Sequence, residues 1–412
     1  MKISIPSKNQ FGFQAGRSTY MAIASVFHLD EITCALDQRY SSIGVFIDLS
    51  KAFDTVDHNI LLEKLYLYGI RGAPHDLMRS YLSDRSQYVF LNGTPSSMLP
   101  ISCGVPQGSI LGPLLFFLYI DDLQYCSEVL KCVLFADDTN MFLTDKNSEL
   151  VFHRLNVELV HVSDWFKVNK LSLNLTKTHY ILFDNKRRSV NSLHSVSFDC
   201  VPIPRTTATK FLGVIIDEKL TWQSHINYVL NKISRNAAVL QRIRYKVNAA
   251  VMLQLYDTMI LPYISYCAII WASVSNNKLK KIHTVQKRVL RLVLHVDRMS
   301  RSRPIFFKLK RLAVQDIYKM QVLSFMYSCL HGEMSFLVAN RFQYNFQIHP
   351  YSTRISKKLH QACARTCVRN TSLLVKGPLI WNELPCALTG LGSFYAFKKA
   401  TKFFLLSSYA PV

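Results

Sequence analysis

The sequence predicts an α+β protein in which a first half of strands and helices is followed by a mostly helical second half. Two runs, residues 42–49 and 132–143, have the Val, Ile and Phe content of buried strands, and each places acids where a strand ends. Farther along, within the basic stretch 278–311, apolar side chains from Leu279 to Val293 recur at helical spacing. With 412 residues, 49% of them hydrophobic, the chain is long enough for two or three domains with a real core.

The first strand, residues 42–49, is apolar on both faces and carries Asp48 at its end, which is typical of a central, covered strand. Asp57 is the expected N-cap of a helix that continues through Leu65 and stops at Gly69. A lone Asp at a strand end can also simply cap the segment that follows. Asp48 alone therefore does not indicate chemistry.

Residues 103–109, Cys-Gly-Val-Pro-Gln-Gly-Ser, form a glycine-containing turn before the apolar segment 110–120. Glycine here would let the backbone approach a substrate closely. Taken alone, the segment is more typical of an ordinary loop before a buried helix.

The adjacent acids Asp137 and Asp138 lie between two β-forming stretches, which predicts a hairpin with both carboxylates at its tip. Asp-Asp is a poor pair for a tight hairpin, which favours Gly or Asn, and two like charges side by side repel unless a cation neutralises them. A solvated surface turn is the alternative. If the strand ending in Asp48 pairs beside this hairpin, three carboxylates meet at one sheet end, an arrangement suited to two Mg²⁺ ions, with Mn²⁺ as a possible substitute.

The net charge of +22 is confined to the C-terminal half. Residues 1–217 contain 20 Lys plus Arg and 21 Asp plus Glu, a net charge of −1, whereas residues 218–412 contain 29 and 6, a net charge of +23. Such an excess favours a polyanionic partner such as nucleic acid. Its densest part predicts an amphipathic basic helix, for which a solvated face of a core helix and a membrane-surface helix are the alternatives. The basic side chains of this helix are Lys280, Lys281, Lys287, Arg288 and Arg291.

Other function classes are disfavoured by the composition. Ten scattered cysteines, with no His at zinc-finger distance from Cys363 and Cys367, indicate reduced thiols in an intracellular protein, nuclear or cytoplasmic. Residues 1–16 lack the apolar core of a signal peptide, and the longest apolar stretches, 111–120 and 259–274, are too short or too polar to span a bilayer. We therefore expect a soluble protein without a membrane partner.

Taken in order, the motifs resemble a known family. They are Phe-Ile-Asp-Leu-Ser-Lys-Ala-Phe-Asp at 46–54, Gly-Val-Pro-Gln-Gly-Ser at 104–109 and Phe-Ala-Asp-Asp at 135–138. This order resembles the palm of reverse transcriptases of non-LTR retrotransposons, of the jockey or LINE kind. Segments similar to the fingers motif, the fourth palm motif, the primer-grip hairpin and the end of such a reading frame are residues 10–19, 171–178, 211–214 and 377–399.

The resemblance implies a right-hand polymerase fold, with an antiparallel palm sheet backed by helices, partial fingers and a mostly helical thumb and C-terminal region. The implied domains are partial fingers at 1–40, palm at 41–215, basic helical thumb at 216–312 and a C-terminal helical region at 313–412. The implied activity is RNA-directed DNA polymerisation with an RNA template, a DNA primer and dNTPs. Oligomeric state is not implied.

The resemblance also implies roles for single residues. Asp48, Asp137 and Asp138 match the catalytic, metal-binding acids, and Phe53 matches an aromatic gate against the ribose 2′-hydroxyl, with core packing as the alternative. The nucleotide-binding set also includes Gln107, Gly108, Lys177 and Arg17, although a plain surface role for Arg17 is equally open. Phe211, Leu212 and Gly213 match the primer grip.

Departures from the family pattern leave alternatives open. Gln14 stands where Arg is usual, and the chain begins within the fingers, so we expect an N-terminally truncated copy that lacks the endonuclease and part of the fingers. One alternative is an inactive remnant that only binds nucleic acid through its basic half. Another is an RNA-dependent RNA polymerase, which Phe53 and the 211–214 hairpin disfavour.

Overall fold

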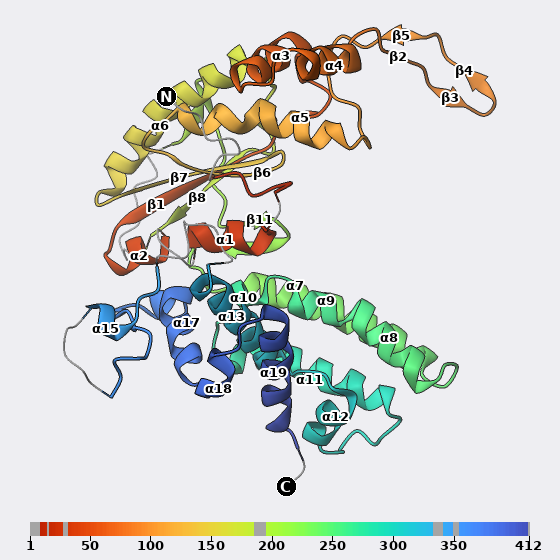
Figure 1. The fold of residues 1–412 in the computed structure, drawn as a ribbon, viewed down its shortest axis with the longest axis vertical. Helices are drawn as coiled ribbons and strands as arrows, with labels where there is room; N and C mark the ends of the chain where they lie inside the picture. The colour runs from red at the N-terminus through yellow and green to blue at the C-terminus, as the bar shows by residue number, and fades with distance from the viewer. Residues whose placement is uncertain are drawn as a thin grey trace. The chain divides into compact units, whose positions relative to one another are not determined.

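The chain folds into two compact units. The computed structural model describes residues 9–14, 16–27, 32–184, 195–332, 341–348 and 354–410. The first unit comprises the described residues of 1–22 and 39–207, and the second those of 23–38 and 208–412 (Figure 1). The first unit contains a sheet with helices and the second is mostly helical, which confirms the predicted α+β class.

A four-stranded antiparallel sheet forms the centre of the first unit. The strand order is β6 (Lys131–Phe135), β7 (Asp138–Asp145), β1 (Ser41–Ile47) and β8 (His179–Phe183). Every residue of β1 is buried, as its apolar sequence predicted for a central strand. The strand ends one residue before Asp48 rather than at Leu49, because the chain turns there to pair with a later loop: Leu49 bridges Leu173.

Helices α3 (His58–Leu67), α5 (Leu111–Ile120) and α6 (Ser148–Val168) pack with the sheet around one hydrophobic core (Figure 1). Ile43, Val45 and Ile47 of β1 belong to this core. The strand's opposite face carries Gly44, over which the ring of Phe142 lies: a Cβ on Gly44 would be 2.7 Å from that ring. Packing on both faces fixes the register of β1, and therefore the position of Asp48.

Helix α3 begins as the sequence predicted. The Asp57 carboxylate accepts hydrogen bonds from the Asn59 and Ile60 backbone N–H groups at 3.0 and 3.1 Å, and Gly69, with φ of +94°, follows the helix end. Lys64 of this helix is buried, donates to Asp122 at 2.8 Å and lies over the Tyr119 and Trp165 rings. Burial has the largest influence on this ammonium group and lowers the pKa of Lys64, although the Asp122 carboxylate opposes the shift.

The first unit has further elements for which the sequence gave no specific expectation. One long hairpin, paired at its base and again near its tip, forms an arm with exposed apolar side chains, among them Tyr88, Phe90 and Met98. The remaining elements of this unit are α4 (Ala73–Leu82), β2 (Ser86–Gln87), β3 (Phe90–Leu91), β4 (Thr94–Pro95), β5 (Leu99–Pro100), η1 (Asp121–Tyr125), β9 (Ser197–Phe198) and β10 (Val201–Pro202).

From residue 208 on, the second unit consists of a hairpin followed by helices. Helix α1 (Thr19–Phe27) contains the division between the units at residues 22 and 23. The other elements are α2 (Ile32–Asp37), β11 (Ala208–Phe211), β12 (Val214–Asp217), α7 (Gln223–Ile243), α8 (Ala249–Met259), α9 (Leu261–Ser265), α10 (Ala268–Trp271), α11 (Asn276–Val293), α12 (Ser302–Leu309), α13 (Val314–Leu330), α15 (Asn345–Ile348), α16 (Cys367–Asn370), α17 (Leu373–Asn382), α18 (Cys386–Thr389) and α19 (Phe394–Ser407).

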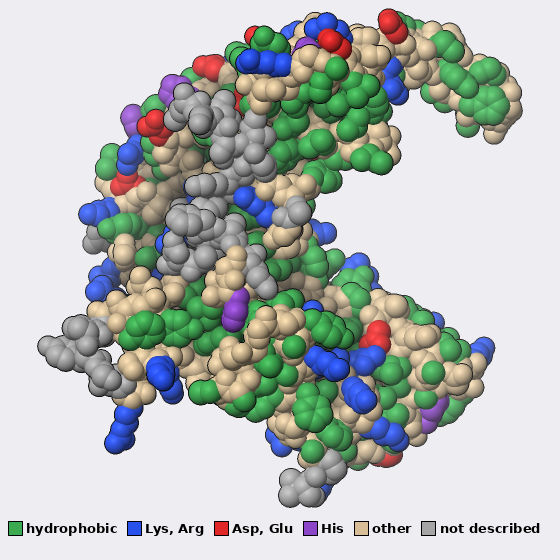
Figure 2. Space-filling model, in the orientation of Figure 1, with side chains coloured by type: hydrophobic (Ala, Val, Ile, Leu, Met, Phe, Trp, Pro, Cys, Tyr) green, Lys and Arg blue, Asp and Glu red, His purple; other side chains and the backbone are tan. Residues whose placement is uncertain are grey.

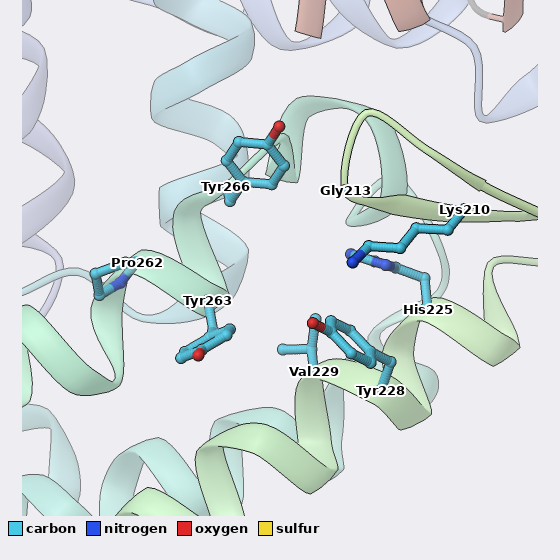
Figure 3. A pocket seen from close by; sticks show the side chains of 8 residues that line it. All are labelled: Lys210, Gly213, His225, Tyr228, Val229, Pro262, Tyr263 and Tyr266. Atoms are coloured by element: carbon cyan, nitrogen blue, oxygen red, sulfur yellow. The ribbon is translucent and has the colours of Figure 1, made fainter. Parts of the chain in front are cut away.

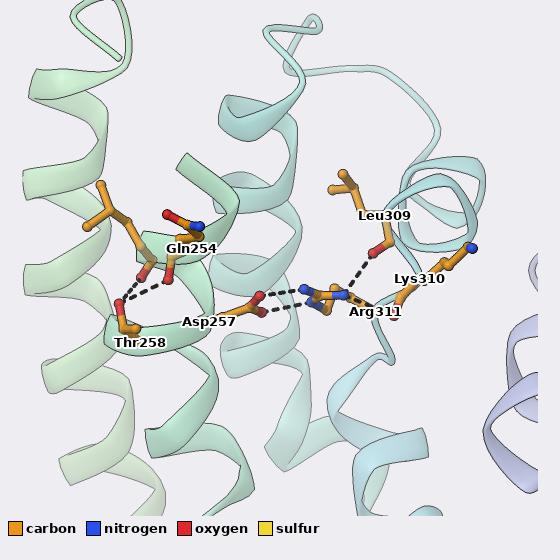
Figure 4. Close-up of polar contacts among 7 residues, drawn as sticks. Gln254, Asp257, Thr258, Leu309, Lys310 and Arg311 are labelled. Atoms are coloured by element: carbon orange, nitrogen blue, oxygen red, sulfur yellow. Dashed lines mark hydrogen bonds and ion pairs between the residues drawn. The ribbon is translucent and has the colours of Figure 1, made fainter. Parts of the chain in front are cut away.

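The few acids of this basic unit hold its segments together. Asp257 of α8 accepts two hydrogen bonds from the Arg311 guanidinium, which also donates to the Leu309 carbonyl (Figure 4). This pairing raises the pKa of Arg311. Asp37 of α2 accepts from the Arg365 and Thr366 N–H groups at 2.9 and 2.7 Å, which ties α2 to the segment before α16.

The division into two units differs from the domain boundaries drawn from the sequence. Residues 208–215, assigned to the palm, group with the second unit because β12 packs on α7, and residues 23–38 do so because α2 packs on α16. The finer assignment to fingers, palm, thumb and C-terminal region remains a prediction. Within the described ranges, no helix is both long and apolar enough to cross a membrane.

Candidate active site

The two adjacent acids occupy a tight hairpin between β6 and β7, but not both lie in its turn. Phe135 pairs with Asp138, so the turn residues are Ala136 and Asp137, and Asp138 begins β7. The prediction of both carboxylates at the tip was therefore wrong by one residue. Ala136 adopts φ of +56°, a conformation that costs an L-residue roughly 1–2 kcal/mol, whereas Asp137 is not among the positive-φ residues. The unfavourable turn residue is thus the alanine, not the acid pair.

The N-terminal segment holds this strained turn in place. Phe11 N–H donates to the Leu134 carbonyl at 2.8 Å, and Leu134 N–H donates to the Asn9 carbonyl at 3.0 Å. Gly12 then lies against the turn so closely that a Cβ on it would be 2.5 Å from the Ala136 nitrogen. Only glycine fits there. The sequence showed Gly12 as part of a motif but gave no sign of its contact with Ala136.

The register of the sheet brings Asp48 to the same edge as the acid pair. Ile47 pairs with Thr139, so the residue after β1 lies beside the residue that begins β7. Asp48 and Asp137 both act on Asp138: its pKa is raised to about 6, chiefly by desolvation and then by these two carboxylates. Although Asp138 keeps exposed surface, nearby protein atoms displace part of its hydration. We call Asp48, Asp137 and Asp138 the acid edge.

The fourth palm-like segment packs against Asp48. Asn174 N–H donates to the Asp48 carbonyl at 2.8 Å, and Thr178 Oγ1 accepts from the Asp48 N–H at 3.3 Å. The Lys177 Nζ lies 3.5 Å from Asp48 Oδ2, with 69% of the Lys177 side chain exposed. Lys177 is therefore beside the acid edge, on a side chain free to swing toward a bound anion.

Among the described residues, no three His, Cys, Asp or Glu side chains already form a metal site. The donor set nevertheless suits a hard divalent cation, which takes carboxylate oxygens. The raised pKa of Asp138 provides the physical reason: desolvation and then the two neighbouring carboxylates disfavour the ionised form, and a bound cation would offset this penalty.

The glycine-containing loop 103–109 is bonded to the turn after Asp48. Gly104 N–H donates to the Val56 carbonyl and Val105 N–H to the Phe53 carbonyl, at 2.7 and 2.8 Å. Gly104 has φ of +89°, and a Cβ on it would be 2.8 Å from the backbone carbonyl oxygen of Asp54. Gln107 Nε2 donates to Asp54 Oδ1 at 2.8 Å. Loop and turn therefore form one surface, with Gln107 and Gly108 exposed on it.

Phe53 and Arg17 each make contacts within the protein. The Phe53 ring is half-buried and lies 4.6 Å, centroid to centroid, from the ring of Phe116, so the core-packing role is real and leaves part of the ring exposed. Arg17 donates to the Gln10 carbonyl at 2.6 Å and lies over the Phe11 ring, and burial lowers its pKa. Arg17 is therefore bound to the segment that holds the acid turn, which argues against a plain surface role.

The primer-grip-like residues form a hairpin in the second unit. Leu212 and Gly213 make the two-residue turn between β11 and β12, both with positive φ, and Phe211 is buried. Tyr266 Oη donates to the Leu212 carbonyl at 2.7 Å. The structure confirms the predicted hairpin, whereas its role as a primer grip remains a prediction.

The basic helix forms as α11, with Leu279, Ile282, Val289 and Val293 buried. Lys280, Lys281 and Arg288 are exposed, whereas Lys287 is half-buried and Arg291 donates to the Ser300 carbonyl. Elsewhere in this unit, Lys and Arg side chains gather between α19 and α12 (Figure 2).

A pocket of about 230 Å³ collects arginines from several segments of the second unit. Arg288 and Arg291 of α11 meet Arg244, which follows α7, and Arg298 of the loop after α11, and no Asp or Glu side chain is among the residues that line it. Sequence reasoning missed Arg244 and Arg298, because only helix packing brings them to α11.

Comparison with known proteins supplies the family. The reverse transcriptase (RNA-dependent DNA polymerase) family model matches residues 2–216. The chain is similar to the probable RNA-directed DNA polymerase from transposon X-element of Drosophila melanogaster, 29% identical over 320 residues, 76% of this chain and 34% of that protein. It is also similar to the RNA-directed DNA polymerase from the mobile element jockey of the same species, 28% identical over 318 residues, 74% of this chain and 34% of that protein.

The chain spans about a third of the length of these curated relatives. A solved structure of apo telomerase from Candida tropicalis aligns with 74% of this chain and 50% of that chain, at 12% identity and a TM-score of 0.38. The family match covers more than half of the chain and includes the whole acid edge, the loop 103–109 and the hairpin turn 212–213. The chain therefore belongs to the reverse transcriptase family, with relatives among the jockey-like non-LTR retrotransposons that its motifs resemble.

Proposed function

We propose that this chain is an RNA-directed DNA polymerase domain that adds deoxynucleotides to a primer 3′-hydroxyl on an RNA template. The observation that carries the proposal is the acid edge, where separate segments place Asp48, Asp137 and Asp138 at one end of a buried sheet. The relatives named RNA-directed DNA polymerases support the same reaction.

Reverse transcriptases use divalent metal ions, and we assign Asp48 and Asp137 as their direct ligands here, with Asp138 beside them. Two Mg²⁺ ions, for which Mn²⁺ can substitute, would when bound activate the primer hydroxyl and steady the triphosphate charge. The acids' own contribution is to hold a fixed negative edge, so that cations are bound without rearrangement of the sheet.

The neighbouring residues would position the nucleotide. Gln107 and Gly108 present the exposed part of the loop bonded to the turn after Asp48, where the nucleotide and template base would lie. Lys177 would release Asp48 and neutralise the departing pyrophosphate, which its exposed side chain allows. Arg17 would act by holding segment 9–12 against the acid turn rather than by touching the triphosphate.

The second unit would hold the nucleic acid. Phe211, Leu212 and Gly213 would contact the primer strand, and the basic residues of α11 with the arginine pocket would bind backbone phosphates. The pocket adds Arg244 and Arg298 to the residues that the sequence predicted. On this proposal the first unit supplies the palm up to residue 207 and the first part of the fingers, and the second supplies the rest of the fingers, the primer-grip hairpin, the thumb and the C-terminal region.

Primer extension tests the proposal. The full chain is incubated with oligo-dT annealed to poly-rA, dTTP and Mg²⁺, and we expect dTMP incorporation that chelation of the metal abolishes and a DNA template reduces. Folded protein that binds the primer–template, with salt-dependent affinity, but incorporates nothing would contradict the polymerase proposal and favour a binding remnant.

Phe53→Ala should relax discrimination against ribonucleotides by roughly 10- to 100-fold, because the ring would otherwise collide with a 2′-hydroxyl. The measurement is the ratio of kcat/KM for rUTP and dTTP on the same primer–template. Phe116→Leu is the matched control. Phe116 is fully buried, so its replacement disturbs the same packing contact with Phe53 but removes no side chain that could reach a nucleotide. An equal change in both variants would assign Phe53 to packing alone.

A further inference from the structure

A second pocket lies beside the hairpin of the second unit. It has a volume of about 290 Å³. Figure 3 shows its walls: Lys210 of β11 and Gly213 of the turn on one side, His225 and Tyr228 of α7 below them, and Tyr263 of α9 with Tyr266 opposite. The volume is at the lower end of the range for small-molecule sites, which suits one flat ring system.

The walls combine flat aromatic rings with positive charge. Tyr228 and Tyr263 come from different helices, α7 and α9, and both line the pocket (Figure 3). The Nζ atom of Lys210, which lines the pocket, lies 5.9 Å from the centre of the Tyr228 ring, and that of Lys232, which is not among the lining residues, lies 5.7 Å from the same centre. No Asp or Glu side chain is among the residues that line the pocket. An aliphatic partner would not require this charge, whereas a nucleotide presents a flat base and an anionic phosphate together.

The pocket wall at the hairpin turn is tightly packed. Tyr266 donates its hydroxyl proton to the Leu212 carbonyl at 2.7 Å, and a Cβ on Gly213 would be 3.0 Å from the Tyr266 ring. Gly213 also has φ of +82°, so both the backbone conformation and the close contact with Tyr266 favour glycine there. The turn and the pocket wall are therefore one unit, and a strand that lies along the turn passes the pocket opening.

His225 fixes the floor of the pocket. It is buried, and its Nδ1 accepts the Ile215 N–H at 3.2 Å, which joins α7 to β12. Burial lowers the pKa of His225 to about 4, so the neutral ring carries its proton on Nε2. The neutral ring thus adds no charge to the floor of the pocket.

We propose that this pocket binds one unpaired nucleobase of a nucleic-acid strand that lies along the 211–214 turn, stacked on Tyr228 and Tyr263 with its phosphate near Lys210. The proposal rests on the proposed function, since it takes the hairpin to contact the bound primer–template, whose single-stranded part supplies the unpaired base. It adds a base-binding subsite to a hairpin that would otherwise contact only the strand's backbone.

The test uses 2-aminopurine, whose fluorescence is quenched by stacking. Primer–templates carry it at one position at a time from the primer 3′ end into a single-stranded overhang, and are bound to the full chain without dNTPs or metal. We expect quenching at one position only. Tyr228→Ala and Tyr263→Ala should abolish it and weaken binding of that strand by about 5- to 100-fold, which corresponds to the loss of one base stack.

Three variants serve as controls. Tyr395→Ala removes a tyrosine that is 75% exposed on α19 and should change nothing. Tyr228→Phe keeps the ring and should keep the quenching, whereas Tyr228→Leu keeps apolar volume without a flat ring and should lose it. The Leu variant preserves the test if Tyr228→Ala does not fold.

Quenching at no position in the unaltered chain, or quenching that persists in Tyr228→Leu and Tyr263→Ala, would overturn the proposal. Free 2-aminopurine deoxynucleotide bound as tightly as the strand would overturn the assignment to a strand. Because the assay requires no incorporation, its failure is separate from failure of primer extension.

Discussion

Asp137→Asn should abolish nucleotide incorporation while leaving the protein folded. Replacing the carboxylate removes a direct ligand for the cations that carry charge stabilisation, and loss of about 4 kcal/mol of that stabilisation is a fall of roughly 10³-fold in rate. The same change removes one of the two carboxylates that raise the pKa of Asp138, so folding stability should be unchanged or slightly higher.

The measurements are primer extension and thermal unfolding with and without Mg²⁺. The unaltered chain should unfold at a higher temperature when Mg²⁺ is present, because a ligand that binds the folded state stabilises it, and Asp137→Asn should lose that increase. Asp164→Asn is the matched control, since Asp164 is an exposed acid on α6. Activity retained in Asp137→Asn would remove Asp137 from the proposed machinery.

Gly12→Ala should lower polymerisation by roughly 10- to 100-fold, because a displacement of about 1 Å at a reacting group can cost that much in rate. The added Cβ would be 2.5 Å from the Ala136 nitrogen, a backbone atom that can only move by shifting the turn that bears Asp137. Gly12 would thus be a positioning residue that touches no substrate.

The readout that separates positioning from general damage is the dependence on metal. Gly12→Ala should raise the Mg²⁺ concentration required for half-maximal extension, in protein that still unfolds cooperatively although at a lower temperature. Gly392→Ala is the control, since Gly392 has open space around its Cβ direction and an ordinary φ. An unchanged metal requirement in Gly12→Ala would mean that the turn does not depend on this contact.

Local patterns in the sequence were sufficient for several elements. The apolar run of β1 indicated a buried central strand, Asp57 marked the start of α3, and the 3.6-residue period gave α11. Each of these depends on neighbours within one turn or one strand, which the sequence displays directly. The hairpin at 211–214 was expected from the family resemblance, and it forms between β11 and β12.

Contacts between distant segments were not visible in the sequence. The predicted turn, Asp137 and Asp138, lies one residue later in the chain than the observed turn, Ala136 and Asp137. The reason is that the pairing of Phe135 with Asp138 sets the strand register, and the position of the acids does not. From the sequence, Arg17 could equally contact the substrate or be a plain surface residue. In the structure it donates a hydrogen bond to the Gln10 carbonyl. Arg244 and Arg298 went unnoticed because their approach to α11 depends on helix packing.

The sequence by itself determined that Asp48, Asp137 and Asp138 belong together, since the ordered motifs carry the family's chemistry. Only the tertiary structure decided how they are held: the register of β1 and β7 brings Asp48 to the start of β7, and Gly12 braces the strained turn at Ala136. The physical reason is that chemistry requires particular side chains, which a sequence shows, whereas positioning requires steric contacts between segments far apart in the chain, which exist only once it has folded.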